Sequence, residues 1–220
     1  MKSAKPSVLK VWARVVNNFG WNIDTQRADT ATPLVKNIIS ICWGVFFVVW
    51  VLAAIFTKRT VYHESGVRRL RYLIPVVIGW YLLFRGHRLP HPFNAHIIPH
   101  TDAILVVSSI LCVCGVAFCL WARAVLGRNW SGTVTLKENH ELIMRGPYRL
   151  ARHPIYTGLL AMLIATAIAQ GHIAGVIGVV LVFASFWIKS AYEEEVMIQQ
   201  FPDQYAAYRG HVKRIIPFLL

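Results

Sequence analysis

Long apolar runs alternate along this chain with short basic or polar segments. A helix needs about 20 apolar residues to cross a bilayer, and four runs reach or approach that length, at 37–56, 101–126, 154–170 and 172–189. A fifth run, 72–84, is shorter and is compatible with either a span or a re-entrant segment. The pattern therefore predicts about five transmembrane helices.

The last two runs are separated by Gln170-Gly171-His172, which predicts a helical hairpin. Pro154 suits the first position of a helix, because its missing N–H costs no hydrogen bond there. After the hairpin the chain becomes amphipathic and charged, with an interruption expected at Pro202. We expect an all-α membrane protein with a C-terminal hairpin, a cytoplasmic linker before it and a tail helix after it.

The first 36 residues carry six Lys or Arg and no apolar run, so we expect no cleavable signal peptide. Apolar residues at helical spacing between positions 8 and 19 predict an amphipathic helix on the membrane surface. We divide the chain into this N-terminal segment (1–36), three membrane spans (37–126) and a half that carries the chemistry (127–220). The linker within 127–148 has turn residues and alternating apolar positions, which predict an extended or hairpin-like segment.

Composition supports a membrane protein, since 56% of the residues are hydrophobic and 15% are charged. The formal net charge of +13 comes from basic residues that flank apolar runs, so we expect a lipid bilayer and not nucleic acid as partner. Six Lys or Arg at 123–152, five at 58–71 and four from 189 onward favour a cytoplasmic side for these segments. The resulting five-span topology places the basic N-terminal segment outside, in conflict with the same rule.

Cysteine and histidine give no strong metal pattern. All four cysteines lie inside apolar runs and are expected to be small buried hydrophobes. Four histidines share one loop: His87, His91, His96 and His100. Their i, i+4 pairs would suit a metal if the loop were helical. Three prolines in the same loop break any such helix: Pro90, Pro92 and Pro99. We expect no metal site.

The richest candidate chemistry lies in the heptapeptide 152–158, Arg-His-Pro-Ile-Tyr-Thr-Gly. A helix that begins at Pro154 presents free N–H groups and a positive dipole end, which suit a carboxylate or phosphate. Arg152 and His153 stand beside that end, Tyr156 adds a hydroxyl and Gly158 allows close approach. The alternative is a membrane-interface cap without a ligand.

Three acids, Glu193, Glu194 and Glu195, follow forty positions after His153, and a hairpin could bring the two clusters together. Charged groups at membrane depth are costly and usually mark a site. A carboxylate here would suit an ammonium or sulfonium group, although a solvated helix face is the alternative. Further along, Tyr205, Tyr208 and Arg209 can share one helix face.

These residues resemble the isoprenylcysteine carboxyl methyltransferase and phospholipid methyltransferase family of integral membrane enzymes. The resemblance covers about 127–220. It rests on these stretches: Gly146-Pro147-Tyr148-Arg149, the heptapeptide 152–158, Glu193-Glu194, and the run from Phe201 through Tyr205, Tyr208, Arg209, Val212 and Arg214 to Pro217. Pro202, where the family often has glycine, and the third acid, Glu195, depart from the pattern.

The resemblance implies S-adenosylmethionine as cofactor, bound from the cytoplasm by the linker, the helix start and the Glu pair. His153 and Pro154 would hold the methionyl carboxylate, with Tyr156 and Gly158 shaping the pocket. Glu193 or Glu194 would face the amino group. The turn at Gly146, Pro147 and Tyr148 would help to enclose the adenosine.

The acceptor would be lipophilic or membrane-associated and would carry a carboxylate, an amine or a thiol. Glu194 and Arg209 are the candidate catalytic residues; Arg209 or Arg214 could orient an anionic acceptor. Two other functions stay open: an NADPH-dependent membrane ene-reductase of the sterol reductase type, which has a similar heptapeptide, and a non-enzymatic membrane scaffold.

Overall fold

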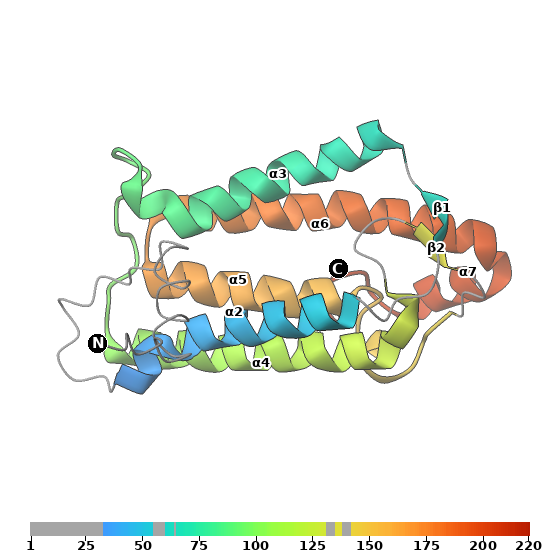
Figure 1. Ribbon diagram of the computed structural model, residues 1–220, viewed down its shortest axis with the longest axis horizontal. Helices are drawn as coiled ribbons and strands as arrows, with labels where there is room; N and C mark the ends of the chain where they lie inside the picture. The colour runs from blue at the N-terminus through green and yellow to red at the C-terminus, as the bar shows by residue number, and fades with distance from the viewer. Residues whose placement is uncertain (1–32, 55–59, 64, 131–134, 138–141) are drawn as a thin grey trace, which may run out of the picture.

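The computed structural model describes residues 33–54, 60–63, 65–130, 135–137 and 142–220. The predicted amphipathic helix between positions 8 and 19 lies outside the described residues. Elsewhere five long helices run side by side (Figure 1). In chain order they are α2 (Pro33–Ala54), α3 (Gly66–Arg85), α4 (Asp102–Leu126), α5 (Pro154–Gln170) and α6 (Ile173–Gln200).

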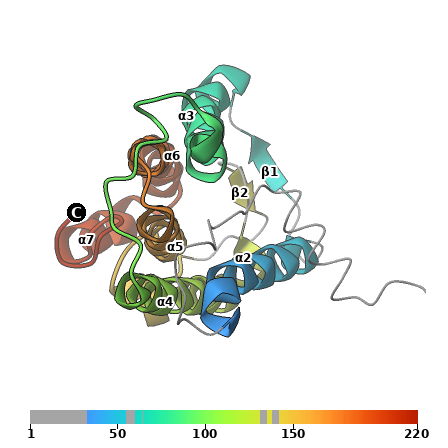
Figure 2. The same ribbon diagram turned by 90° about the vertical axis from the view of Figure 1, so that its left-hand side faces the viewer.

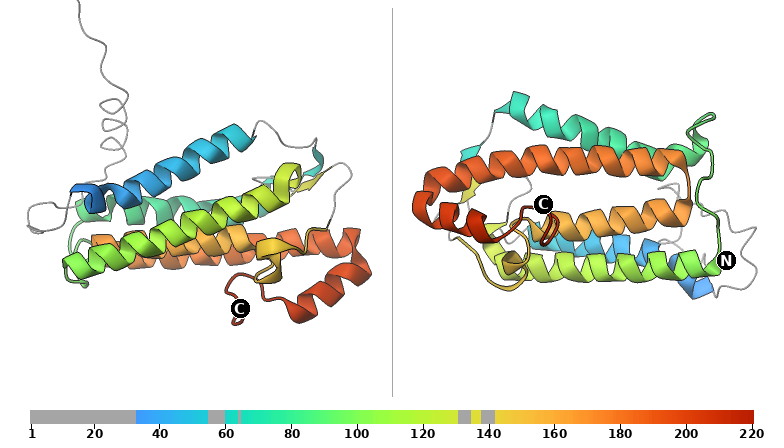
Figure 3. Two further views of the ribbon diagram at one scale, coloured as in Figure 1. Left: turned by 90° about the horizontal axis from the view of Figure 1, so that it is seen from below. Right: turned by 180° about the vertical axis from the view of Figure 1, so that it is seen from behind.

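The predicted helical hairpin is confirmed, because α5 and α6 join through Gly171 in the left-handed region at φ 71°. Phe201 ends α6, and the short α7 (Pro202–His211) begins at the expected proline. Figure 3 shows α7 folding back from the end of α6, so that the C-terminal segment returns toward the start of α5.

Three of the helices, α2, α4 and α6, combine the length and the hydropathy of a membrane span, and α5 is a shorter apolar helix of 17 residues. The fifth element, α3, is longer than its apolar run 72–84: it has 20 residues, about 30 Å, enough to cross the hydrocarbon core. Its start is set by Ser65, whose side chain accepts a hydrogen bond from the backbone N–H of Arg68.

Seen end-on, α5 lies between α6 and α4, with α3 against α6 and α2 against α4 (Figure 2). Small residues permit the tight pairs. A Cβ built on Gly158 would lie 2.7 Å from the Gly115 carbonyl oxygen, and one on Gly178 would lie 2.6 Å from the Gly79 carbonyl oxygen. Close approach of backbones at glycine is a common way for membrane helices to pack.

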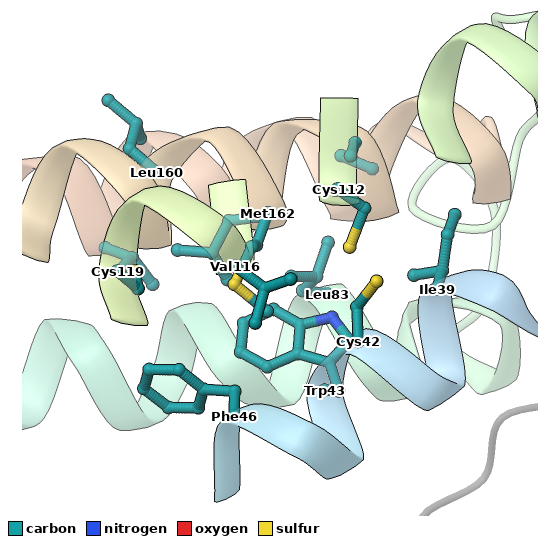
Figure 4. Close-up of a cluster of buried hydrophobic side chains, with 14 of the residues drawn as sticks. Ile39, Cys42, Trp43, Phe46, Leu83, Cys112, Val116, Cys119, Leu160 and Met162 are labelled. Carbon is teal, nitrogen blue, oxygen red and sulfur yellow. The ribbon is translucent and has the colours of Figure 1, made fainter. Parts of the chain in front are cut away.

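Apolar side chains fill the centre of the bundle and also cover its outside. In the core, Trp43 is 4% exposed, and its indole N–H donates to the hydroxyl of Thr166 at 3.0 Å, which satisfies the buried donor. Figure 4 shows Trp43 among side chains from α3, α4 and α5. On the outside, Ile74, Val107 and Val180 are each more than half exposed, as expected for positions that face lipid.

The segment between α3 and α4 closes one end of the bundle. Its backbone bonds to the α5–α6 turn, with the Ile97 N–H on the Gly171 carbonyl at 2.8 Å and the Ile173 N–H on the Ala95 carbonyl at 3.0 Å. The ring of His96 lies beside that of His172, 4.1 Å between centroids. The described residues hold no group of three His, Cys, Asp or Glu side chains arranged to bind a metal.

At the other end, two short strands join distant segments: β1 (Thr60–His63) and β2 (Thr135–Lys137) pair antiparallel, with Tyr62 opposite Leu136. Within the predicted extended linker, the described residues Thr135–Lys137 are extended, and they pair with the segment between α2 and α3.

Candidate active site

The start of α5 is held by the returning C-terminal segment. The backbone N–H groups of Arg152 and His153 donate to the carbonyls of Lys213 and Arg214 at 2.8 and 2.9 Å. One turn into the helix, the Thr157 hydroxyl donates to the Ile215 carbonyl. These bonds orient the N-terminus of α5 and bring the residue Arg214 beside it.

Glu194 lies at the centre of the site and is 2% exposed. Arg152 Nε donates to its Oε1 at 2.9 Å, and Arg214 binds both carboxylate oxygens, from Nε at 3.2 Å and Nη2 at 3.1 Å. His153 Nε2 lies 3.2 Å from Oε1, and Arg209 Nε lies 3.6 Å from Oε2. A buried carboxylate is tolerated when it is paired in this way.

Glu193 has a more open setting, with its side chain 24% exposed. The Tyr156 hydroxyl donates to Oε1 at 2.8 Å, and His153 Nδ1 lies 3.3 Å from Oε2. Lys189, one turn earlier on α6, is 3.7 Å away. Of the two acids, Glu193 is the more exposed.

Both glutamates lie beyond the apolar part of α6, which ends near Lys189. Burial raises the pKa of Glu194, but the hydrogen bonds from His153 and Arg152 outweigh it and lower that pKa to about 2. Burial likewise opposes ionisation of Glu193, yet the charge of Lys189 and the contact with His153 lower its pKa. Both side chains are therefore carboxylates at neutral pH.

His153 bridges the two carboxylates through its two ring nitrogens. Burial disfavours the imidazolium, but the hydrogen bonds and charges of Glu193 and Glu194 prevail, and the pKa of His153 is raised above 6.5. Its ring stacks on Tyr156 at 5.5 Å, and Tyr156 stacks on Phe186 at 4.8 Å. This stack fixes the ring plane, so the acids and the helix start share one rigidly held imidazole ring.

The turn at 146–149 forms a short 3-10 helix, η3 (Gly146–Arg149), beside the acids. Pro147 and Tyr148 are buried. The hydroxyl of Tyr208 on α7 donates to the Tyr148 carbonyl, which joins α7 to the turn. Burial raises the pKa of the Tyr148 phenol, and the charges of Tyr208 and Glu193 raise it further.

Some residues singled out from the sequence pack against neighbouring helices and do not contact Glu193 or Glu194. Gly158 lies against α4, where an added Cβ would be 2.6 Å from Cys119 Sγ. Gly146, at φ 61°, lies against Trp121 and Val125 of α4. Glu195 points to the other side of α6 and pairs with Arg68 at 3.1 Å.

The cations that hold the acids are only partly evident in the sequence. Arg152 is expected beside the helix start, and Lys189 as a partner of the acids only on a solvated helix face, whereas both are direct partners of the Glu pair. Arg123 counts in the sequence only as one of the basic residues at 123–152, but it lies inside the apolar run 101–126 and is 6% exposed. A charged residue within such a run is itself a signal of a functional position.

The comparisons with known proteins agree on one kind of enzyme. Residues 103–204 match the phospholipid methyltransferase family. Protein-S-isoprenylcysteine O-methyltransferase B of Arabidopsis thaliana is 30% identical over 96 residues, 42% of this chain and 49% of that protein. A probable protein-S-isoprenylcysteine O-methyltransferase of Oryza sativa subsp. indica is 28% identical over 177 residues, 77% of this chain and 88% of that protein.

Among solved structures, the eukaryotic intramembrane Ras methyltransferase, isoprenylcysteine carboxyl methyltransferase, superposes with a TM-score of 0.51 at 20% identity. The match covers 96% of this chain and 84% of that one, and it shows a shared membrane fold. These findings do not favour the ene-reductase or the scaffold. This integral membrane protein is similar over residues 103–204 to the phospholipid methyltransferase family and over most of its length to a probable plant protein-S-isoprenylcysteine O-methyltransferase, and it shares the membrane fold of the solved isoprenylcysteine carboxyl methyltransferase.

Proposed function

We propose that this protein uses S-adenosylmethionine to methylate a lipophilic acceptor, with the carboxylate of a lipid-linked cysteine as the first candidate. The proposal that S-adenosylmethionine is the methyl donor rests on one observation: His153, at the start of α5, contacts both Glu193 and Glu194. The proposed acceptor is supported by the names of the plant relatives, which are protein-S-isoprenylcysteine O-methyltransferases.

The residues fit the amino-acid end of such a cofactor. The cluster contains cations and a helix start for a carboxylate, and one partly open carboxylate for an ammonium group. We assign the carboxylate end to His153 and the α5 start at Pro154, and the ammonium end to Glu193, which would exchange its contact with Lys189 for the ligand. Gly146, Pro147 and Tyr148 would enclose the adenosine, and Tyr156 would complete the wall.

Glu194 has a different role in this proposal. Its carboxylate is already surrounded by Arg152, His153 and Arg214, so it positions the residues that touch the ligand. Arg209 is 44% exposed on its side chain and pairs with Glu194, and we assign it to the rim of the site.

When bound, the cofactor supplies a methyl group activated by a sulfonium leaving group. The protein's task is then alignment, because a displacement at carbon depends on the two reactants being in line. A carboxylate acceptor has no proton to lose, so the residues described need supply no general base for it. We further propose that this end of the bundle faces the cytoplasm, since the basic segments gather there.

The test is calorimetric titration of the purified full chain in detergent with S-adenosylhomocysteine and, separately, with NADPH. We expect the first to bind, and His153→Ala and Glu193→Gln to weaken it at least about tenfold, as loss of a charge-assisted contact does. His91→Ala, an exposed histidine at the opposite end, is the matched control. Binding of NADPH alone would overturn the proposal.

A further inference from the structure

A buried arginine lies outside the acid cluster, near the end of α4. Arg123 is 6% exposed, and its neighbours on α4, Cys119 and Ala122, are fully buried. Its Nη2 donates to the Ala53 carbonyl on α2 at 2.8 Å, and its Nη1 donates to the Gly127 carbonyl. The guanidinium also lies 4.9 Å from the centre of the Trp130 ring.

Arg123 differs from the basic residues that hold the acid cluster in what balances its charge. Arg152, Arg214 and Lys189 each pair with a glutamate. Within the described part of the chain, Arg123 pairs with no carboxylate, and its buried Nε has no hydrogen-bond partner. Carbonyl dipoles and an aromatic face compensate a buried cation only in part, because burying a charge without a counter-charge costs several kcal/mol.

The position of Arg123 links it to the proposed cofactor site. Cys119, one turn earlier on the same face, donates from Sγ to the Ile155 carbonyl in the first turn of α5 at 3.4 Å. Arg123 therefore lies one turn further along α4, beyond the α5 start. The Tyr148 phenol lies within electrostatic reach of both the acid cluster and Arg123, since the charge of Glu193 raises its pKa and that of Arg123 lowers it.

The surroundings of Arg123 favour a ligand that arrives from the membrane. It is held between the ends of α2 and α4, two of the helices with the hydropathy of a membrane span. Trp50 of α2 packs edge-on against Trp130 at 5.7 Å, so aromatic rings flank the cation.

We propose that Arg123 binds the anionic group of the methyl acceptor and holds it toward the α5 start. This rests on the proposed function. Arg123 takes the acceptor-binding role that the sequence suggested for Arg209 or Arg214, because both of those arginines pair with Glu194. For a carboxylate acceptor, one oxygen forms the new bond to the methyl carbon while the carbon–sulfur bond breaks and its electron pair stays on sulfur. No proton moves, so Arg123 acts by charge and position.

The experiment compares N-acetyl-S-farnesylcysteine with its carboxamide, each titrated into the S-adenosylhomocysteine-bound full chain. We expect the wild type to prefer the carboxylate about tenfold to a hundredfold, as a charge-assisted hydrogen bond implies. Arg123→Gln should lose this preference, and Arg123→Lys should keep part of it. Affinity for S-adenosylhomocysteine should stay within about twofold in both variants, because the donor residues are intact.

Arg88→Gln, an exposed arginine at the opposite end, is the matched control and should behave as wild type. An unchanged carboxylate preference in Arg123→Gln, or in Arg123→Lys if the first variant does not fold, would overturn the proposal. So would an Arg123-dependent gain in binding of phosphatidylglycerol and not of the farnesylated carboxylate, because the ligand would then be a phospholipid headgroup. Failure of the proposed function is distinct: the wild type would bind no S-adenosylhomocysteine.

Discussion

Glu193 and Glu194 are adjacent in sequence but occupy different surroundings, because neighbouring helix positions point about 100° apart. Glu194 is enclosed by Arg152, His153 and Arg214, whereas Glu193 keeps 24% of its side chain exposed. Removing the two charges should therefore have different consequences for stability and for ligand binding.

We expect Glu194→Gln to destabilise the protein by about 3–5 kcal/mol, because it leaves buried cations without their counter-charge. Glu193→Gln should cost less stability and act mainly on binding of S-adenosylhomocysteine. Chemical unfolding in detergent measures the first effect and calorimetry the second. Glu195→Gln is the control, since that side chain is 52% exposed; equal losses of stability from all three substitutions would contradict the assignment.

His153 should make ligand binding depend on pH. Because its folded-state pKa is raised above 6.5, its stabilising charge is fully present below about 6.5 and is lost as the pH rises through the raised value. Affinity for the carboxylate of S-adenosylhomocysteine should fall over the same range. Titrations at several pH values measure this step, and His153→Gln should remove it; a wild-type affinity that stays flat from pH 6 to 9 would exclude the imidazolium from the binding site.

At the scale of helices, the site depends on how closely α5 approaches α4. The contact runs through Gly115, Gly158 and Cys119, and it holds the first turns of α5 at a fixed height along α4. The glycines of this pair therefore matter to the site through packing, whether or not a ligand touches them.

We expect Gly158→Ala to lower stability and weaken S-adenosylhomocysteine binding, because the new Cβ would meet the Gly115 carbonyl at 2.7 Å. Gly210→Ala on α7 is the matched control, since its Cβ would meet nothing within 4 Å, and it should be neutral or stabilising by up to about 1 kcal/mol. Melting temperature and calorimetry on the two variants provide the comparison. A Gly158→Ala variant as stable as Gly210→Ala would mean that the helices can separate without cost.

At the scale of the whole molecule, the apolar runs were enough to predict the helices, the hairpin at Gly171 and the break at Pro202, because each follows from local hydropathy or backbone chemistry. They underestimated α3, whose first turns carry Arg68, Arg69 and Arg71 and so fall outside any apolar run. The pairing of β2 with β1 could not be read from the linker, since both partners are short and lie far apart in sequence.

The candidate site was predictable as two opposite charge clusters, but not in its internal pairing. The sequence indicates that the 152–158 heptapeptide and the acids could meet. It does not indicate that Arg152 and Arg214 neutralise Glu194, because Arg214 is brought to the site by tertiary bonds such as those between the backbones of 152–153 and 213–214. Such a contact depends on the tertiary fold and leaves no periodic signal.

The length of α6 sets the depth of the proposed site. Its 28 residues extend about 42 Å, against about 30 Å of hydrocarbon. Glu194 lies about 32 Å along the axis from Ile173, which is close to the level of the phospholipid headgroups. A substrate need not leave the bilayer in this proposal: its tail can stay among the acyl chains while its polar end reaches the proposed donor site, so acceptors with different tails can present their reactive group at the same height.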